Sequence, residues 1–349
     1  MKPSRDYDIR FGHGILKSTS AEWPPFIAIT TPTSWKAATP FLARTPKAVS
    51  NVKWLDRTYL DEMVNKLPDD ASLVIGVGGG RPLDAAKVVA YRKRLPLVLV
   101  PTVVSTGAIV HGYIGAYDGR VLKGDLKDKD GTLMGVDPDY VLTDYDLVLS
   151  GPERMNTAGL GDVLCGYAGI AEWRAGAAAG TSPAFEEKTA APALQLFKEI
   201  VSGFPPTINA SGKLTPESVK FILRTVQDRD DRRLRNPAAP SSDHEFLFVL
   251  EETNDRSWIH GEIVALGAVI VAWHTRQQPK EFVSRMDVCK VRFRPKDVGM
   301  TKSELQVALA EFPARMGDKA LGRNSASCLR SDPITGRTFE ECWQWLNSV

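Results

Sequence analysis

The sequence predicts an α/β domain with a mostly parallel sheet, followed by an all-α domain. Short strand-like runs alternate with helical stretches over residues 1–150, and strand character stops after Ser150-Gly151-Pro152. Alanine-rich and leucine-rich helical patterns characterise the chain from there on. A chain of 349 residues is long enough for two domains, each with its own core. We therefore expect domains at residues 1–150 and 151–349.

Buried-strand runs and helical stretches alternate in the first domain. The expected strands cover residues 7–11, 26–30, 73–77, 97–100 and 140–143. Residues 56–67 and 82–92 carry apolar positions at helical spacing, whereas residues 116–131 are charged and turn-rich. We expect that last stretch to form a surface hairpin or loop.

The second domain is predicted to be helical. Helical patterns cover residues 162–178, 183–202, 215–227, 243–252 and 260–275, and amphipathic segments cover residues 302–312 and 338–346. Trp343 and Trp345 are expected to pack the last helix against the body of the domain.

Composition argues against several classes of partner and site. The 44 basic and 42 acidic residues are mixed along the chain, which argues against a nucleic-acid footprint or a membrane-binding face. No apolar stretch approaches the ~18 residues of a membrane span, and the first residues lack the apolar core of a secretion signal. We expect a cytoplasmic protein. The scattered cysteines argue against a disulfide framework or a thiolate zinc site; they are Cys165, Cys289, Cys328 and Cys342.

A glycine-rich turn follows the strand expected at residues 73–77. Gly78, Gly79 and Gly80 let the backbone turn tightly, and the helix that follows offers free N–H groups and a positive dipole end. A pyrophosphate is the natural guest of such a turn. The spacing differs from G-x-G-x-x-G, so the ordinary Rossmann fingerprint does not apply. The alternative is a turn that serves packing only.

A second polar loop, residues 101–107, follows the strand expected at 97–100. It should lie at the same sheet edge as the glycine turn, because ligands bind at the carboxyl ends of parallel strands. Its hydroxyl groups, including those of Thr102 and Ser105, could hold a cofactor phosphate or ribose. The alternative is an ordinary Ser/Thr turn.

Two histidines and one aspartate are candidate metal ligands. His244 lies at an expected helix start, and His260 opens a helix of small and apolar residues. Two imidazoles and one carboxylate form a standard site for a catalytic divalent metal. Asp162, after a glycine pair at an expected helix start, is the best carboxylate candidate, although an N-cap role is the simpler alternative. The histidines taken singly could equally be satisfied core or capping residues.

Four motifs together resemble the glycerol dehydrogenase and glycerol-1-phosphate dehydrogenase group. They are Gly-Gly-Gly-x-x-x-Asp-x-Ala-Lys at 78–87, Pro-Thr-x-x-Ser-Thr at 101–106, Gly-Leu-Gly-Asp at 159–162 and His-Gly-Glu at 260–262. The wider superfamily includes iron-containing alcohol dehydrogenases and dehydroquinate synthase. The resemblance implies a dehydroquinate synthase-like fold, with an N-terminal dinucleotide-binding domain and a C-terminal helical domain for metal and substrate.

The resemblance also implies cofactors and site residues. NAD or NADP is expected, with a divalent metal that is usually zinc, and iron or nickel as alternatives. The implied metal ligands, which are also the catalytic residues, are Asp162, His244 and His260, with His274 in reserve. The implied cofactor contacts are Gly78, Gly79, Gly80, Arg81, Pro82, Asp84, Thr102 and Ser105. In such a site the metal lowers the pKa of a substrate hydroxyl, and hydride passes from carbon to the nicotinamide.

The chain departs from the group's pattern at the substrate loop. Gly107 stands where relatives commonly have an acid that meets substrate hydroxyls, so glycerol itself becomes a weaker expectation and a larger or different hydroxylated substrate becomes plausible. Arg81 replaces the usual lysine or serine and could still hold a phosphate. The strand at 26–30 ends without the acid that favours NAD, so both coenzymes stay open.

A cluster of arginines precedes His244 and could bind a phosphorylated substrate. Its members are Arg229, Arg232, Arg233 and Arg235. Acidic residues are interleaved with them, which is more typical of a solvated helix face.

Two other functions remain open. A sugar-phosphate cyclase of the dehydroquinate synthase type also uses NAD and a metal. Such enzymes resemble one another in having glutamate as first metal ligand and a Gly-Gly-Lys loop after the cofactor serines. This chain has Asp162 and no lysine at 109–116. A catalytically inactive cofactor-binding relative is supported only by Gly107. The resemblance implies a homo-oligomer and gives no reason to expect a nucleic-acid or membrane partner.

Overall fold

The computed structural model describes residues 8–118, 121–127, 131–132, 134–231, 242–254, 256–316 and 327–349. The chain forms two compact units. The first unit comprises Met1–Asn156 and Ile208–Gln227, and the second comprises Thr157–Thr207 and Asp228–Val349. The division on the N-terminal side thus falls inside a helix, and a later segment returns to the first unit.

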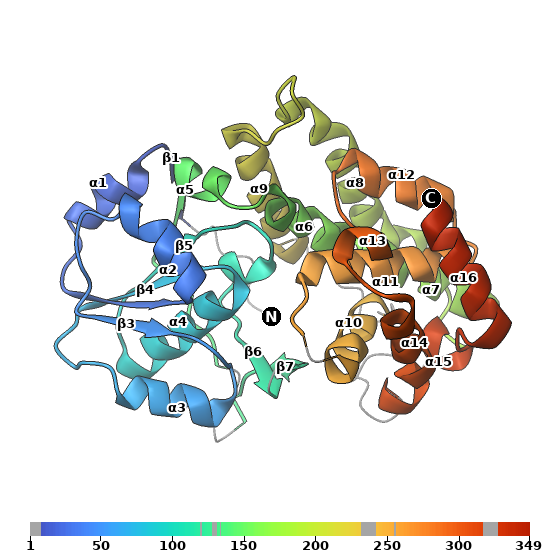
Figure 1. Ribbon diagram of the computed structural model, residues 1–349, viewed down its shortest axis with the longest axis horizontal. Helices are drawn as coiled ribbons and strands as arrows, with labels where there is room; N and C mark the ends of the chain where they lie inside the picture. The colour runs from blue at the N-terminus through green and yellow to red at the C-terminus, as the bar shows by residue number, and fades with distance from the viewer. Residues whose placement is uncertain are drawn as a thin grey trace. The chain divides into compact units, whose positions relative to one another are not determined.

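The first unit contains a six-stranded parallel sheet with the strand order β1-β8-β5-β4-β2-β3 (Figure 1). Its strands are β1 (Ile9–Gly12), β2 (Phe26–Thr30), β3 (Ala48–Asn51), β4 (Leu73–Gly78), β5 (Leu97–Pro101) and β8 (Tyr140–Asp144). The parallel sheet predicted from the sequence is confirmed. β3 was not predicted, because this short edge strand alternates half-buried and exposed residues and has no apolar run.

Helices cover both faces of the sheet (Figure 1). They are α1 (Ile15–Ala21), α2 (Pro32–Ala38), α3 (Arg57–Asn65), α4 (Gly80–Lys93) and α5 (Tyr145–Ser150), with short 3-10 turns at Thr39–Phe41 and Gly107–Ile109. Leu16, Ala38 and Leu147, from α1, α2 and α5, pack on the sheet face that carries Ile75 and Val98. α4 packs on β4, β2 and β5 from the other face. The strands between these layers are almost fully buried, which is typical of a parallel sheet.

Close contact between α4 and β4 depends on Gly76. A Cβ added at Gly76 would lie 2.7 Å from the Cβ of Ala86 and 3.0 Å from Leu99 Cδ2. Because both neighbours are buried and tightly packed, a larger residue would push the helix away from the sheet. The glycine therefore fixes the position of α4 and of the turn that precedes it.

A buried lysine ties the segment after β5 to α4. The Nζ of Lys87 donates to Asp84 Oδ1 at 2.9 Å, to the carbonyl of Ala108 at 2.7 Å and to that of Tyr113 at 3.0 Å. The other Asp84 oxygen accepts from the N–H of Gly115 at 3.1 Å. The expected hairpin follows as β6 (Gly115–Asp118) and β7 (Val121–Asp125), which pair antiparallel.

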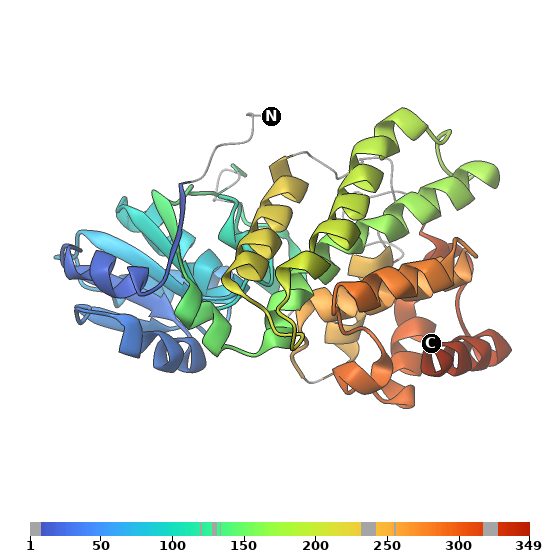
Figure 2. The same ribbon diagram turned by 90° about the horizontal axis from the view of Figure 1, so that it is seen from above.

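The second unit contains helices and no strands among its described residues. α6 (Glu153–Leu164) and α9 (Pro216–Asp231) each span the division between the units, and the other helices are α7 (Gly166–Ala178), α8 (Glu187–Gly203), α10 (Ser242–Thr253), α11 (His260–His274), α12 (Pro279–Val288), α13 (Pro295–Val298), α14 (Lys302–Met316), α15 (Cys328–Ser331) and α16 (Gly336–Ser348), with a 3-10 turn at Pro205–Thr207. α7 and α8, both green in Figure 2, pack against each other. Trp345 of α16 stacks on Trp273 of α11 with ring centroids 6.2 Å apart, as expected for the last helix.

The structure corrects one helix boundary. The sequence predicted a helix start at Asp162, but α6 begins at Glu153, directly after the Gly151-Pro152 break, and Asp162 lies near its C-terminal end. Asp162 is therefore not an N-cap. The chain passes into α7 at Cys165, whose backbone stays in the right-handed helical region, so the sequence pattern runs on without a visible break. No helix in the part of the chain that the structure describes is long and apolar enough to cross a membrane.

We predict that Lys87→Met destabilises the protein by about 3–5 kcal/mol, because it leaves the Asp84 charge buried without its partner. The side chains of Lys87 and Asp84 are 0% and 8% exposed. Urea denaturation measures the loss. Lys66→Met is the control, since Lys66 is 78% exposed and its nitrogen lies 3.9 Å from Glu62; its effect should stay within about 0.5 kcal/mol. Equal stability of the two variants would contradict the role of Lys87.

Candidate functional site: a glycine turn and a histidine-carboxylate cluster

The triple-glycine turn lies where the strand order of the sheet reverses. β2 leads to β3 on one side, whereas β4 leads to β5 and β8 on the other. Ligands of open α/β sheets bind at such a reversal, outside the carboxyl ends of the strands. Gly78 ends β4 with φ +144°, and an added Cβ would lie 2.5 Å from Pro82 Cγ and 3.0 Å from Ser34 Oγ. This position therefore requires glycine.

The loop after β5 lies against the same turn. The N–H of Thr102 donates to the carbonyl of Gly78 at 3.0 Å. A Cβ added at Gly79 would lie 3.8 Å from Ser105 Oγ, and one added at Gly80 would lie 3.4 Å from Thr106 Cγ2. No side chain caps the N-terminus of α4, which begins at Gly80. The structure thus brings the predicted glycines, Thr102 and Ser105 together around a helix N-terminus suited to an anion.

The remaining predicted cofactor residues differ in their surroundings. Arg81 is exposed, and Pro82 is buried in the first turn of α4. Asp84 is 6% exposed, and its two oxygens accept from Lys87 and from Gly115. Asp84 therefore fixes the segment that follows β5. Gly107, where relatives commonly have an acid, is buried at the start of a 3-10 turn that the Thr106 hydroxyl caps by accepting from the N–H of Ala108.

The helical unit brings Asp162 and His260 together through a glycine contact. Gly161 precedes Asp162 on α6, and Gly261 follows His260 on α11. A Cβ added at Gly261 would lie 1.9 Å from the carbonyl oxygen of Ala158, and one added at Gly161 would lie 2.4 Å from the carbonyl oxygen of Gly261. The two backbones therefore touch at the step next to each candidate ligand, and only glycine fits there.

Two further contacts position His244. Gly267 of α11 admits the backbone of Asp243, whose Cα would lie 2.9 Å from an added Cβ. The buried carboxylate of Glu172 accepts from the N–H groups of Ser242 at 3.1 Å and Cys328 at 2.8 Å, which caps the N-termini of α10 and α15. His244 therefore projects from a helix whose start is fixed on two sides.

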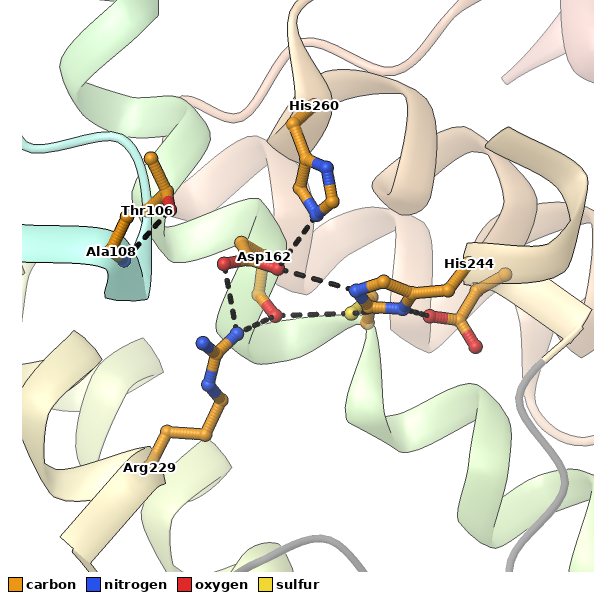
Figure 3. A network of polar contacts seen from close by, with 8 residues as sticks. Thr106, Ala108, Asp162, Arg229, His244 and His260 are labelled. Carbon is orange, nitrogen blue, oxygen red and sulfur yellow. Dashed lines mark hydrogen bonds and ion pairs between the residues drawn. The ribbon is translucent and has the colours of Figure 1, made fainter. Parts of the chain in front are cut away.

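One carboxylate oxygen faces both imidazoles (Figure 3). Asp162 Oδ1 lies 3.5 Å from Nε2 of His244 and 3.3 Å from Nε2 of His260. The two rings are 5.2 Å apart between centroids and inclined at 61°. Asp162 is 4% exposed, whereas His244 and His260 are 22% and 36% exposed. The structure thus brings the three predicted metal ligands together.

The hydrogen bonds of His244 leave its Nε2 able either to donate a proton to Asp162 or to bind a metal ion. His244 Nδ1 lies 2.6 Å from Asp243 Oδ2, and because a carboxylate only accepts, Nδ1 carries the proton. In the neutral ring, Nε2 then turns a lone pair toward Asp162 Oδ1. Two facing acceptors need a proton or a metal ion between them. A carboxylate that orients a histidine in this way is a common partner of metal-binding imidazoles.

Arg229 supplies a fixed charge on the other side of Asp162. Its NH1 lies 2.9 Å from Asp162 Oδ2 and 2.9 Å from the Asp162 carbonyl oxygen (Figure 3). Burial raises the pKa of Asp162, but Arg229 and the hydrogen bonds from the two histidines outweigh it and hold that pKa well below its usual value. Burial lowers the pKa of His244, and the carboxylates of Asp243 and Asp162 raise it above its usual value. The carboxylate at the centre of the cluster is therefore ionised.

Cys165 is a potential ligand that sequence reasoning missed. Its Sγ donates to the Asp162 carbonyl at 3.1 Å and lies 4.0 Å from His244 Nδ1. Among the described residues, Asp162, Cys165 and His244 are the group whose potential ligand atoms all lie within 4.8 Å of one another. Burial raises the pKa of the Cys165 thiol well above its usual value, which disfavours the thiolate. The sequence signal for this ligand is a cysteine three residues after the aspartate. A search for paired cysteines at C-x-x-C spacing does not detect a single cysteine of this kind.

The other sequence candidates lie elsewhere. His274 ends α11, fourteen residues and about 21 Å along the helix from His260, and its Nε2 pairs with Asp332 Oδ2 at 3.3 Å. His274 therefore lies apart from the cluster around Asp162. Arg232, Arg233 and Arg235 lie outside the described residues.

Comparisons with known proteins identify relatives of this chain. Residues 9–133 match the family model of the iron-containing alcohol dehydrogenases. A glycerol-1-phosphate dehydrogenase (NAD(P)+) from Pyrobaculum arsenaticum is 27% identical over 270 residues, which cover 75% of this chain and 72% of that protein. Another from Saccharolobus solfataricus is 26% identical over 342 residues, which cover 92% of each chain.

A solved structure has the same fold. The crystal structure of a probable glycerol dehydrogenase from Sinorhizobium meliloti matches with a TM-score of 0.69 over 100% of this chain and 99% of that chain. The two sequences are 17% identical, so this likeness concerns the fold alone.

We predict that Gly261→Ala weakens both stability and metal affinity. The added Cβ would meet the main-chain oxygen of Ala158, which cannot move away by a side-chain rotation, so α11 must shift from α6 and carry His260 away from Asp162. We expect a destabilisation of about 1–3 kcal/mol and a loss of zinc affinity of about tenfold or more. Chelator competition measures the affinity.

Gly166→Ala is the matched control for this substitution. Its added Cβ would lie 3.3 Å from the rim of the Phe197 ring, a side chain that can yield. If Gly261→Ala and Gly166→Ala bound zinc equally well, the glycine contact would not set the ligand geometry.

Proposed function

Because the chain belongs to the iron-containing alcohol dehydrogenase family, we propose that it is a metal-dependent, NAD(P)-linked oxidoreductase. It transfers hydride between nicotinamide and a hydroxyl of a polyol or polyol phosphate. The observation that carries this proposal is the single oxygen of Asp162 that faces the Nε2 atoms of both His244 and His260. An ionised carboxylate and two imidazoles form a donor set that fits a catalytic divalent metal.

The two units take different parts in the proposed function. The α/β unit would bind the coenzyme, with its pyrophosphate at the glycine turn and at the N-terminus of α4. Thr102 and Ser105 would add contacts from the loop after β5, and Asp84 would keep that loop in place through Lys87. The helical unit would hold the metal through Asp162, His244 and His260. Arg81, exposed beside the turn, would hold a coenzyme phosphate.

The chain's residues prepare the site for hydride transfer. When bound, a divalent cation supplies Lewis acidity that lowers the pKa of a substrate hydroxyl, and NAD or NADP supplies the hydride acceptor. Asp243 keeps the proton of His244 on Nδ1, so that Nε2 stays a lone-pair donor. Arg229 keeps Asp162 ionised. Zinc suits this set of nitrogen and oxygen ligands, with iron and nickel as the alternatives to be tested.

A polyol phosphate is the substrate class that we favour. Gly107 offers no carboxylate for the hydroxyls of an uncharged polyol, and two relatives that cover most of the chain are named for glycerol-1-phosphate. These names also favour a dehydrogenase over a sugar-phosphate cyclase. The ordered cluster around Asp162 favours an active enzyme over an inactive relative.

We predict that the zinc-loaded protein reduces NAD or NADP with glycerol-1-phosphate faster than with glycerol. A spectrophotometric screen of both coenzymes against glycerol, its phosphates and other polyols measures this, and reconstitution with zinc, iron or nickel identifies the metal. Absence of hydride transfer from every tested alcohol by fully metal-loaded protein would refute the proposal.

Asp162→Asn separates metal binding from coenzyme binding. We expect it to lose bound metal and activity while it still binds the coenzyme, because the glycine turn belongs to the other unit. Its loss of metal affinity should exceed the about 10–100-fold that removal of an outer-shell partner costs. Asp332→Asn is the matched control, since Asp332 contacts His274 and is 82% exposed. Full metal content and full activity in Asp162→Asn would show the ligand assignment to be wrong.

A further inference from the structure

A single nitrogen of Arg229 contacts both a side-chain oxygen and the main-chain oxygen of Asp162. NH1 lies 2.9 Å from Asp162 Oδ2 and 2.9 Å from the carbonyl oxygen of the same aspartate. Arg229 comes from the last turn of α9 and is 13% exposed, so the contact is largely shielded from solvent. It is not the solvated helix face that the surrounding charge pattern suggested.

We infer that Arg229 is a positioning residue that makes Asp162 a one-oxygen metal ligand and offsets its charge. The inference rests on the proposed function, because it concerns the same metal site. A nitrogen anchored to the main-chain oxygen of Asp162 and to its Oδ2 fixes the side-chain torsion angles of that aspartate. Oδ2 is thereby occupied, and only Oδ1 is left facing His244 and His260.

Arg229 also contacts the main chain of α6 near the C-terminal end of that helix. Asp162 belongs to the last turn of α6. The Asp162 carbonyl accepts from Arg229 NH1 and from Cys165 Sγ. The main-chain contact therefore holds the guanidinium in place independently of its ion pair with Oδ2.

The positive charge of Arg229 predicts the sign of its effect on metal affinity. The guanidinium stays protonated at all accessible pH values, so it cancels the Asp162 charge whether or not a metal is bound. Without it, Asp162 would present an uncompensated charge and two available oxygens to a divalent cation. Removal of Arg229 should therefore tighten metal binding and raise the coordination number, whereas a merely structural arginine would loosen the site.

The test is a cobalt titration of the metal-free protein and of three variants. For Arg229→Gln we expect about tenfold tighter Co²⁺ binding, since a nearby positive charge is lost, and weaker visible absorption, since cobalt with a higher coordination number absorbs less strongly. Arg229→Lys keeps the charge and should bind Co²⁺ as tightly as the unmodified protein. If Arg229→Gln folds poorly, the Co²⁺ affinity of Arg229→Lys still tests the charge argument.

Arg294→Gln is the matched control. Arg294 pairs with both oxygens of Asp287, at 2.6 Å and 2.8 Å, and donates to the main-chain oxygen of Val349 at 2.7 Å, so it resembles Arg229 in kind. It contacts none of the proposed ligands, and its removal should leave the cobalt spectrum and affinity unchanged.

The outcomes separate the inference from the proposed function. If the unmodified protein binds stoichiometric Co²⁺ and Arg229→Gln has the same spectrum and affinity, or a weaker affinity, the positioning role is refuted and the metal site stands. If the unmodified protein binds no Co²⁺ at all, the proposed metal site falls and the role of Arg229 falls with it. Looser binding by Arg229→Lys alone would also refute the charge argument.

Discussion

The ligand cluster depends on the backbone contact between α6 and α11. Gly161 and Gly261 let the two helices touch where Asp162 and His260 leave them, and a methyl group at Gly261 would overlap the carbonyl oxygen of Ala158. The 3.3 Å distance from Asp162 Oδ1 to Nε2 of His260 depends on this approach. Gly267 extends the same principle to α10, which carries His244. The metal-site geometry is thus set by small residues beside the ligands as much as by the ligands.

A buried ion pair stabilises the candidate residues in each unit. In the α/β unit, Lys87 neutralises Asp84 and fixes the carbonyls of the following loop. In the helical unit, Arg229 neutralises Asp162 and donates to its main-chain oxygen. An unpaired charge at either place would be costly. Each pair therefore couples the stability of its unit to the position of the residues proposed to act.

Much of this arrangement could be predicted from the sequence, because its signals are local. The apolar runs gave the central strands, and the glycine turn and the two histidines stand at element ends as expected. The helix boundary at Asp162 could not be read, since α6 passes into α7 with helical backbone throughout. The contacts of Arg229 and Cys165 with Asp162 depend on how separate helices pack, which spacing along the chain does not encode.

X-ray absorption spectroscopy of the zinc-loaded protein tests the central claim most directly. Asp162, His244 and His260 as ligands predict a shell of nitrogen and oxygen atoms at about 2.0–2.2 Å, with the multiple scattering of imidazole rings and no sulfur. Cys165 lies close enough to Asp162 and His244 to offer a rival set of ligands. A sulfur atom at about 2.3 Å from the zinc would contradict the account, because it would place the metal on Cys165.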